Sequence, residues 1–208
     1  MRSAMKIAVV GIAMLAAACG NKTRSATPAA NLPPPPANAA ELVDALRSGG
    51  YVLFVRHGAT DREQDNPRVV LEDCSTQRNL SAAGQAQAEA IAAGIKRLHI
   101  PIGQVRASPY CRTADTARLA FGYMLLDVDL GPLHGDSAAA RLAAVRRLFS
   151  SPPLIGKNTV LVGHGDTFQK LAGYELADGE TAVIRPNPNG TNWTILGRIA
   201  ANQWAGIR

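Results

Sequence analysis

The chain has 208 residues, of which 47% are apolar and 5% aromatic, a length and composition that suit one domain with extensions around an aliphatic core. Its 22 basic and 16 acidic residues give a net charge of +6. No run of Lys and Arg is interleaved with aromatic residues, which argues against nucleic-acid binding. A mildly basic protein that handles anions fits this composition better.

Residues 1–18 have the pattern of a secretory signal peptide. Arg2 and Lys6 precede an apolar run over 7–18 that ends in small residues. A run of about twelve residues is well short of the roughly 20 needed to span a bilayer. We therefore expect export and removal of this leader, rather than a buried N-terminal helix.

Cys19 is a candidate lipidation site. Residues 15–19, Leu-Ala-Ala-Ala-Cys, resemble a bacterial lipobox, in which the cysteine is lipidated and becomes the mature N-terminus. Ordinary cleavage after Ala18 is the alternative. If the usual sorting rule for bacterial lipoproteins applies, Gly20 favours the outer membrane. We expect a periplasmic protein that is anchored to the outer membrane through Cys19.

Residues 19–39 predict a linker between this anchor and a globular domain over 40–208. The linker contains Pro33-Pro34-Pro35-Pro36 and otherwise mostly Ala, Asn and Thr. Such a composition cannot bury a core and is typical of a semi-rigid spacer.

Cys74 and Cys111 are the two remaining cysteines. After export they would meet an oxidising compartment, where disulfides persist. The loop that a bond between them closes would contribute about 4 kcal/mol in the chain-entropy description. We predict this disulfide; two separate free thiols are the alternative.

The domain is predicted to alternate helices and strands, from helical spacing of apolar residues and from short apolar runs rich in β-forming residues. In chain order the predicted elements are a helix at 41–48, a strand at 51–55, a helix at 81–98 with Ser81 as its N-cap, a strand at 104–107, helices at 112–121 and 136–149, a strand at 159–162, and antiparallel edge strands at 182–184 and 193–199. This order predicts an α/β fold, a three-layer α/β/α sandwich with a mainly parallel central sheet.

Polar side chains follow three of the predicted strands. They are Arg56-His57, then Ser108 with Arg112 just beyond it, then His164. In parallel sheets, ligands bind beyond the carboxyl ends of the strands. We therefore expect these side chains to face one crevice.

This set of residues suits phosphoryl transfer. The reaction needs positive charge around the phosphoryl oxygens and a nucleophile in line. Arginine binds phosphate oxygens bidentately, and a neutral histidine can act as the covalent nucleophile. Nearby arginine charges should keep His57 neutral. A zinc site on His57 and His164 is the alternative, but the sequence offers no third ligand in a pattern such as His-Glu-x-x-His.

Four segments resemble, in order, the motifs of the histidine phosphatase superfamily, the phosphoglycerate mutase-like group. Arg56-His57-Gly58 resembles its Arg-His-Gly motif, and Val162 to Gly165 its second-histidine motif. Residues 78–88, with Gly84 and Gln87-Ala88 in place, resemble the Arg-x-Leu-Thr-x-x-Gly-x-x-Gln-Ala segment. Residues 108–117 resemble Ser-Pro-x-x-Arg-x-x-x-Thr-Ala. The resemblance covers nearly all of residues 51–199.

The resemblance implies a phosphoglycerate mutase-like fold and a role for each matching residue. His57 would be the nucleophile that becomes phosphorylated. Arg56, Arg112 and His164 would bind the phosphoryl group and its transition state. Asn79 and Ser81 would be secondary candidates for the pocket wall. The family needs no metal or organic cofactor.

The motifs do not identify a single proton donor. Mutase-like members often use a Glu between the Ser-Pro-x-x-Arg segment and the second histidine, and residues 113–163 contain no Glu. The acid-phosphatase branch uses an Asp directly after the second histidine, and here Asp166 follows His164 by two positions. Asp166 is the first candidate and Asp136 the second.

The sequence therefore predicts an exported phosphatase that acts on phosphate monoesters, such as envelope sugar phosphates, other phosphorylated small molecules or phosphoproteins. One alternative is a catalytically weak, envelope-tethered module that only binds phosphate ligands. Another is a purely structural lipoprotein, which would explain the leader and the linker but not the four motifs.

Overall fold

The computed structural model describes residues 38–61, 68–135 and 137–208. The predicted signal peptide, the lipidation site Cys19, most of the predicted linker and Asp136 lie outside the described residues. Within the described part of the chain, no helix is both long and apolar enough to cross a membrane.

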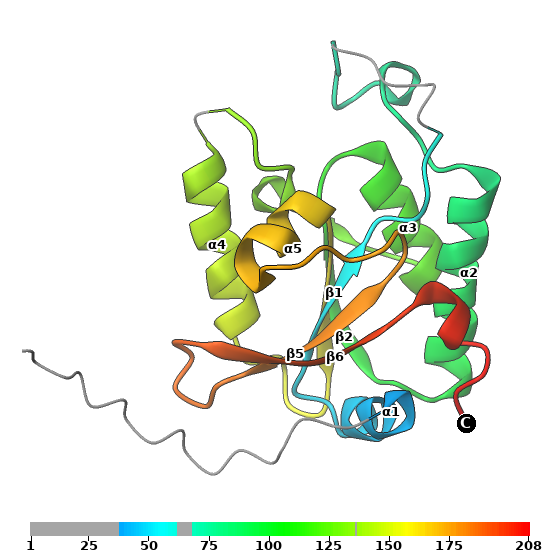
Figure 1. Ribbon diagram of the computed structural model, residues 1–208, viewed down its shortest axis with the longest axis vertical. Helices are drawn as coiled ribbons and strands as arrows, with labels where there is room; N and C mark the ends of the chain where they lie inside the picture. The colour runs from blue at the N-terminus through cyan, green and yellow to red at the C-terminus, as the bar shows by residue number, and fades with distance from the viewer. Residues whose placement is uncertain (1–37, 62–67, 136) are drawn as a thin grey trace, which may run out of the picture. The chain divides into compact units, whose positions relative to one another are not determined.

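A six-stranded mixed sheet forms the middle layer (Figure 1). Its strands are β1 (Val52–Arg56), β2 (Ile102–Ala107), β3 (Leu125–Leu126), β4 (Asn158–Gly163), β5 (Thr181–Pro186) and β6 (Trp193–Ile199), in the order β3-β2-β4-β1-β5-β6. The first four strands in this order are parallel to their neighbours, whereas β5 runs antiparallel to both β1 and β6. The predicted mainly parallel sheet is confirmed.

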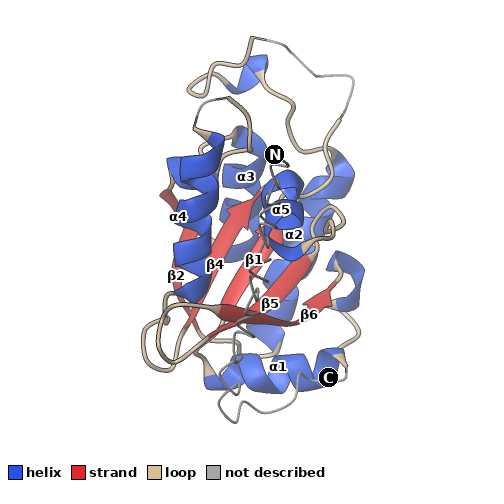
Figure 2. Ribbon diagram, turned by 60° about the vertical axis from the view of Figure 1, so that its left-hand side comes forward, coloured by secondary structure: helices blue, strands red, loops and turns tan. Residues whose placement is uncertain are grey.

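Helices cover both faces of the sheet (Figure 2). They are α1 (Ala39–Ser48), α2 (Ala82–Arg97), α3 (Cys111–Phe121), α4 (Ala138–Ser150) and α5 (Gly165–Ala172). Short 3₁₀ turns lie at η2 (Cys74–Thr76), η3 (Val128–Leu130) and η4 (Ala201–Gln203).

The alternation of side chains along β1 separates two hydrophobic cores, as the period of a strand requires. Leu53 and Val55 pack in one core with residues of α1, α2 and α3. Val52 and Phe54 pack in the other with residues of α4 and α5. These two cores make the molecule the three-layer sandwich that the sequence predicts.

Most element bounds lie within two residues of the prediction. Helix α1 begins at Ala39 because the Asn38 side chain caps it, accepting hydrogen bonds from the backbone N–H groups of Ala40 and Glu41. Helix α2 starts after Ser81, whose Oγ accepts from the Gly84 N–H as predicted. Helix α5 and strand β3 were not predicted. They have only eight and two residues, too few for a clear periodic pattern.

Three parallel strands end at the same level. In the register of the sheet, Arg56 lies beside Gly163 and Ala107 beside Val162. The ladder continues for one more residue, since the N–H of His57 donates to the Gly163 carbonyl and the N–H of Ser108 to the Val162 carbonyl. The sheet therefore delivers His57, Ser108 and His164 to one edge.

Candidate active site

The loop that follows β1 is held by two of the helices on one face of the sheet, α2 and α3. The Gly58 N–H donates to Thr116 Oγ1 of α3 at 3.0 Å, and the Ala59 N–H donates to Gln87 Oε1 of α2 at 2.8 Å. Gly58 also lies so close to α2 that a Cβ there would be 2.5 Å from the Gly84 carbonyl oxygen. Glycine at position 58 is thus a steric requirement of the loop that carries His57.

The His57 ring is buried and has a defined tautomer. Its Nδ1 lies 2.8 Å from the Gly58 carbonyl oxygen, which can only accept a hydrogen bond. Nδ1 therefore carries the proton, and Nε2 keeps a free electron pair. Burial is the main cause that lowers the pKa of His57 from 6.5 to about 3; the Gly58 hydrogen bond partly opposes it, and the charges of Arg112, Arg56 and Arg78 lower the pKa further. His57 is therefore a neutral imidazole near neutral pH.

His164 lies beside it, with the two ring centroids 5.5 Å apart. Arg112 Nη2 is 3.2 Å from His164 Nδ1, so Nδ1 accepts and Nε2 donates to Ser108 Oγ at 3.0 Å. Burial, followed by the Arg112 charge, holds the pKa of His164 well below its ordinary value of 6.5. His164 is thus a neutral hydrogen-bonding group that binds Arg112.

Tyr110 joins these residues on their outer side. The Arg112 guanidinium lies over the Tyr110 ring, 4.7 Å from its centroid, and the same ring meets the edge of His164 at a centroid distance of 5.3 Å. Such cation–π and edge-to-face contacts restrict the orientation of all three groups. Arg112 and His164 are thereby pre-positioned as one unit.

Arg56 is placed differently from Arg112. Its guanidinium pairs with Glu175 at 2.7 Å and with Asp178 at 2.9 Å, and also donates to the Leu176 carbonyl. Its charge still reaches both histidines, because it contributes to the lowered pKa values of His57 and His164. The structure thus brings His57, Arg112 and His164 together directly and sets Arg56 at their side, held by two carboxylates.

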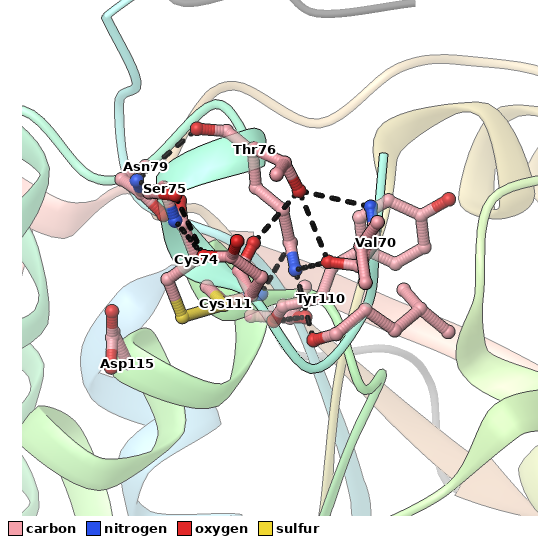
Figure 3. The surroundings of a disulfide bond; sticks show 12 residues. Val70, Cys74, Ser75, Thr76, Asn79, Tyr110, Cys111 and Asp115 are labelled. Carbon is pink, nitrogen blue, oxygen red and sulfur yellow. Dashed lines mark hydrogen bonds between the residues drawn. A yellow bond between two sulfur atoms is a disulfide. The ribbon is translucent and has the colours of Figure 1, made fainter. Parts of the chain in front are cut away.

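A disulfide attaches the segment over 68–80 to the start of α3 (Figure 3). Cys74 and Cys111 are bonded, with their Cα atoms 5.8 Å apart, which agrees with the predicted pairing. The buried Gln77 side chain reinforces this attachment: its Oε1 accepts from the Cys111 N–H at 2.9 Å, and its Nε2 donates to the Val70 and Leu71 carbonyls. The Cys74–Cys111 bond therefore joins the two segments that carry Arg78 and Arg112, each within four residues of a bonded cysteine.

The secondary candidates have mainly structural contacts. Asn79 Nδ2 donates to the carbonyls of Cys74 and Gln77, and Ser81 Oγ donates to the Ala59 carbonyl as well as capping α2. Asp166 is exposed, and its two oxygens accept from the backbone N–H groups of Leu133 at 2.7 Å and Thr167 at 2.8 Å.

Three residues of the site were missed in the sequence. Arg78 stands at the head of a motif segment, yet no role was assigned to it; its charge is now seen to act on His57. Tyr110 occupies a variable position of the Ser-Pro-x-x-Arg segment. His134 belongs to no motif, and it contributes to the lowered pKa of His164. In the described part of the chain, no three His, Cys, Asp or Glu side chains cluster as a metal site would require.

The buried neutral state of His57 predicts a pH-dependent stability. The unfolded chain binds this proton near pH 6.5 and the folded chain only near pH 3, so stability is lost as pH falls through that window. We expect wild type to lose about 2–3 kcal/mol more unfolding free energy than His57→Gln between pH 7.5 and pH 4.5. Urea unfolding of both proteins at both pH values measures this. Equal losses would show that His57 is not buried as a neutral ring.

We expect the disulfide to affect anion binding as well as stability, because it holds the segment over 68–80 that carries Arg78. Replacing both Cys74 and Cys111 by Ser should lower the unfolding free energy by about 2–4 kcal/mol and weaken tungstate binding, because Arg78 loses its attachment to the α3 start. Urea unfolding and calorimetric titration with tungstate test the two effects separately. Unchanged tungstate affinity in the folded double variant would mean that the disulfide contributes to stability alone.

Comparison with known proteins bears on this geometry. Residues 52–132 match the family model of the histidine phosphatase superfamily (branch 1). Among curated proteins, agropine synthesis reductase of Rhizobium rhizogenes is 26% identical over 175 residues, which are 68% of this chain and 40% of that protein. The chain therefore spans less than half the length of this curated relative.

Solved structures share the fold at low sequence identity. The protein histidine phosphatase SixA, complexed with tungstate, has a TM-score of 0.53 at 19% identity, over 73% of this chain and 97% of that one. Phosphoserine phosphatase of Entamoeba histolytica has a TM-score of 0.52 at 14% identity, over 74% and 98%. Phosphoglycerate mutase of Thermus thermophilus has a TM-score of 0.51 at 20% identity, over 72% and 98%.

These likenesses identify a phosphoglycerate mutase-like fold, and the family model covers the segments that carry His57, Arg78 and Arg112. The match to the histidine phosphatase superfamily thus covers residues 52–132, the part of the chain that carries two of the three strand ends at the site.

Proposed function

We propose that the protein hydrolyses phosphate monoesters through a covalent phosphohistidine at His57. One observation carries the proposal: a buried neutral imidazole has its Nδ1 proton bound to the Gly58 carbonyl and its other nitrogen available for bonding, within the field of three arginines. Such a nitrogen is a competent nucleophile at neutral pH without a separate general base.

Substrate binding would use the positive charges around His57. A phosphate monoester is a dianion near neutral pH, and Arg112 and Arg78 can neutralise its equatorial oxygens. Arg56, which is paired with Glu175 and Asp178, would add a partly compensated charge at their side. Because Arg112 is oriented by His164 and Tyr110 before any ligand arrives, little side-chain freedom remains to be lost on binding.

The reaction would then proceed in two displacements. Nε2 of His57 forms a bond to phosphorus while the ester P–O bond breaks and its electron pair leaves with the alcohol oxygen. Water then attacks the phosphohistidine, and the electron pair of the P–N bond returns to Nε2. The Gly58 carbonyl favours the charged ring of the intermediate, because its bond to the Nδ1 proton strengthens when the ring becomes cationic.

The proposed substrates are bulky or varied phosphate monoesters. SixA is described as a protein histidine phosphatase and the Entamoeba histolytica relative as a phosphoserine phosphatase, and this chain covers almost all of both folds. Envelope sugar phosphates and phosphoproteins fit the same chemistry and the proposed place of action.

We also propose that the domain works after export, anchored through Cys19. The Cys74–Cys111 disulfide supports this, because such bonds persist in oxidising compartments. The mass of the mature N-terminus from envelope fractions is expected to show a diacylglyceryl-modified Cys19. An unmodified terminus at Cys19 would favour ordinary cleavage after Ala18, and an intact leader would contradict export.

Hydrolysis of p-nitrophenyl phosphate with chelator present tests the central proposal. Wild type should turn over, and His57→Ala should lose at least about 10³-fold in kcat because no nucleophile replaces the ring. His99→Asn is the matched control, since His99 is exposed and lies at the opposite edge of the sheet, before β2. Tungstate binding without turnover in the wild type would favour the phosphate-binding module instead.

A further inference from the structure

Expulsion of an alkoxide from a phosphate monoester needs a proton donor, and the central residues of the site cannot supply it. His57 is the nucleophile, and its remaining ring proton is bound to the Gly58 carbonyl. His164 is neutral. Its Nε2–H donates a hydrogen bond to Ser108 Oγ, and its Nδ1 accepts one from Arg112. Neither ring has a proton to donate to a leaving oxygen.

Asp166 is engaged elsewhere. Its Oδ2 accepts from the Leu133 N–H and its Oδ1 from the Thr167 N–H, so both oxygens serve as acceptors, the role of an ionised carboxylate. The first of these bonds attaches the segment over 131–134 to the N-terminus of α5. Asp166 thereby positions the residue that follows Leu133.

That residue is His134, an exposed imidazole at the rim of the site. Its Nε2 lies 3.4 Å from the Tyr110 hydroxyl, and the Tyr110 ring in turn contacts His164 and supports the Arg112 guanidinium. His134 is thus one aromatic side chain away from the groups that would bind the phosphoryl oxygens. It is also close enough to His164 for its charge to act there.

In-line attack fixes where a donor must stand. When His57 approaches phosphorus from the buried side, the leaving oxygen points away from it, toward the open rim. In that pose Arg112 and His164 would bind the phosphoryl oxygens, which leaves a group at the rim to meet the leaving oxygen. Histidine is the side chain whose ordinary titration range makes it both a proton donor and a proton acceptor near neutral pH.

We propose that His134 is the general acid of this site, with Asp166 and Tyr110 as its positioning residues; this rests on the proposed phosphatase function. As the ester bond breaks, the imidazolium of His134 gives its proton to the leaving oxygen, which departs as the alcohol. Neutral His134 then takes a proton from the attacking water as the P–N bond of the intermediate breaks, which restores the imidazolium and releases phosphate.

Several other groups set the charge at this rim. Tyr110 contacts His134 from the start of α3, His164 at the end of β4 is close enough to be affected by its charge, and Asp166 of α5 bonds the backbone of Leu133. Arg141 of α4 donates to the Pro132 carbonyl at 3.2 Å.

The test uses two substrates that differ in leaving group. Because p-nitrophenolate leaves without a proton, His134→Gln should lower kcat/KM for p-nitrophenyl phosphate less than about tenfold, but lower it for an alkyl phosphate by about 100-fold or more. Tungstate affinity and melting temperature should stay at wild-type values, since His134 does not bind the phosphoryl oxygens. His99→Asn, which exchanges an exposed histidine at φ 54° for a residue that tolerates that backbone, should change neither substrate's kcat/KM.

The outcomes separate the two proposals. Both proposals are supported if His57→Ala loses activity on both substrates and His134→Gln loses activity selectively on the alkyl phosphate. Equal losses for alkyl and aryl substrates in His134→Gln, or none, would overturn the role of His134 and leave the phosphohistidine route standing. A selective alkyl loss in Asp166→Asn but not in His134→Gln would make Asp166 the acid. Wild type inactive on both substrates would overturn the phosphatase function itself.

Discussion

The hydrogen bond from the His57 ring to the Gly58 carbonyl is the interaction on which the rest of the site depends. It fixes the proton on Nδ1 and thereby leaves the electron pair of Nε2 free for bonding. A carbonyl can be held there only if the Gly58 backbone is held too. Thr116 of α3 and Gln87 of α2 do this by accepting from Gly58 and Ala59. Two helices on one face of the sheet thus determine the chemistry of one ring.

Burial of the neutral His57 ring lowers the free energy of unfolding of the protein. A histidine that stays neutral to about pH 3 must be buried near arginines, and such burial is unfavourable whenever the unfolded chain could bind a proton. The fold offsets this with two hydrophobic cores and with the disulfide that joins the segment over 68–80 to α3. An energetic cost of this kind is expected where a site needs an unusual protonation state.

The sequence predicted every strand except the two-residue β3, the three strand ends and the Cys74–Cys111 pairing, because each rests on local pattern or on composition. Helix α5 was missed because its eight residues are too few for periodicity to show. His134 was missed for a different reason. It lies in a segment without regular structure, and its place beside Tyr110 arises from tertiary contacts between Leu133 and Asp166 and between Tyr110 and His164. No spacing along the chain carries that information.

The two aspartates considered in the sequence were chosen because acids of related enzymes are carboxylates. The structure gives a physical reason to weigh an imidazole as well. Three arginines lie close enough to His57 to lower its pKa, and a carboxyl group in the same field would be ionised near neutral pH and so would carry no proton for the leaving oxygen. His134 lies at the rim, where Tyr110 contacts both it and the Arg112 guanidinium, and Asp166 holds the backbone of the preceding residue. The charges proposed to bind the phosphoryl group therefore argue for a proton donor set back from the arginines over a carboxyl group beside them.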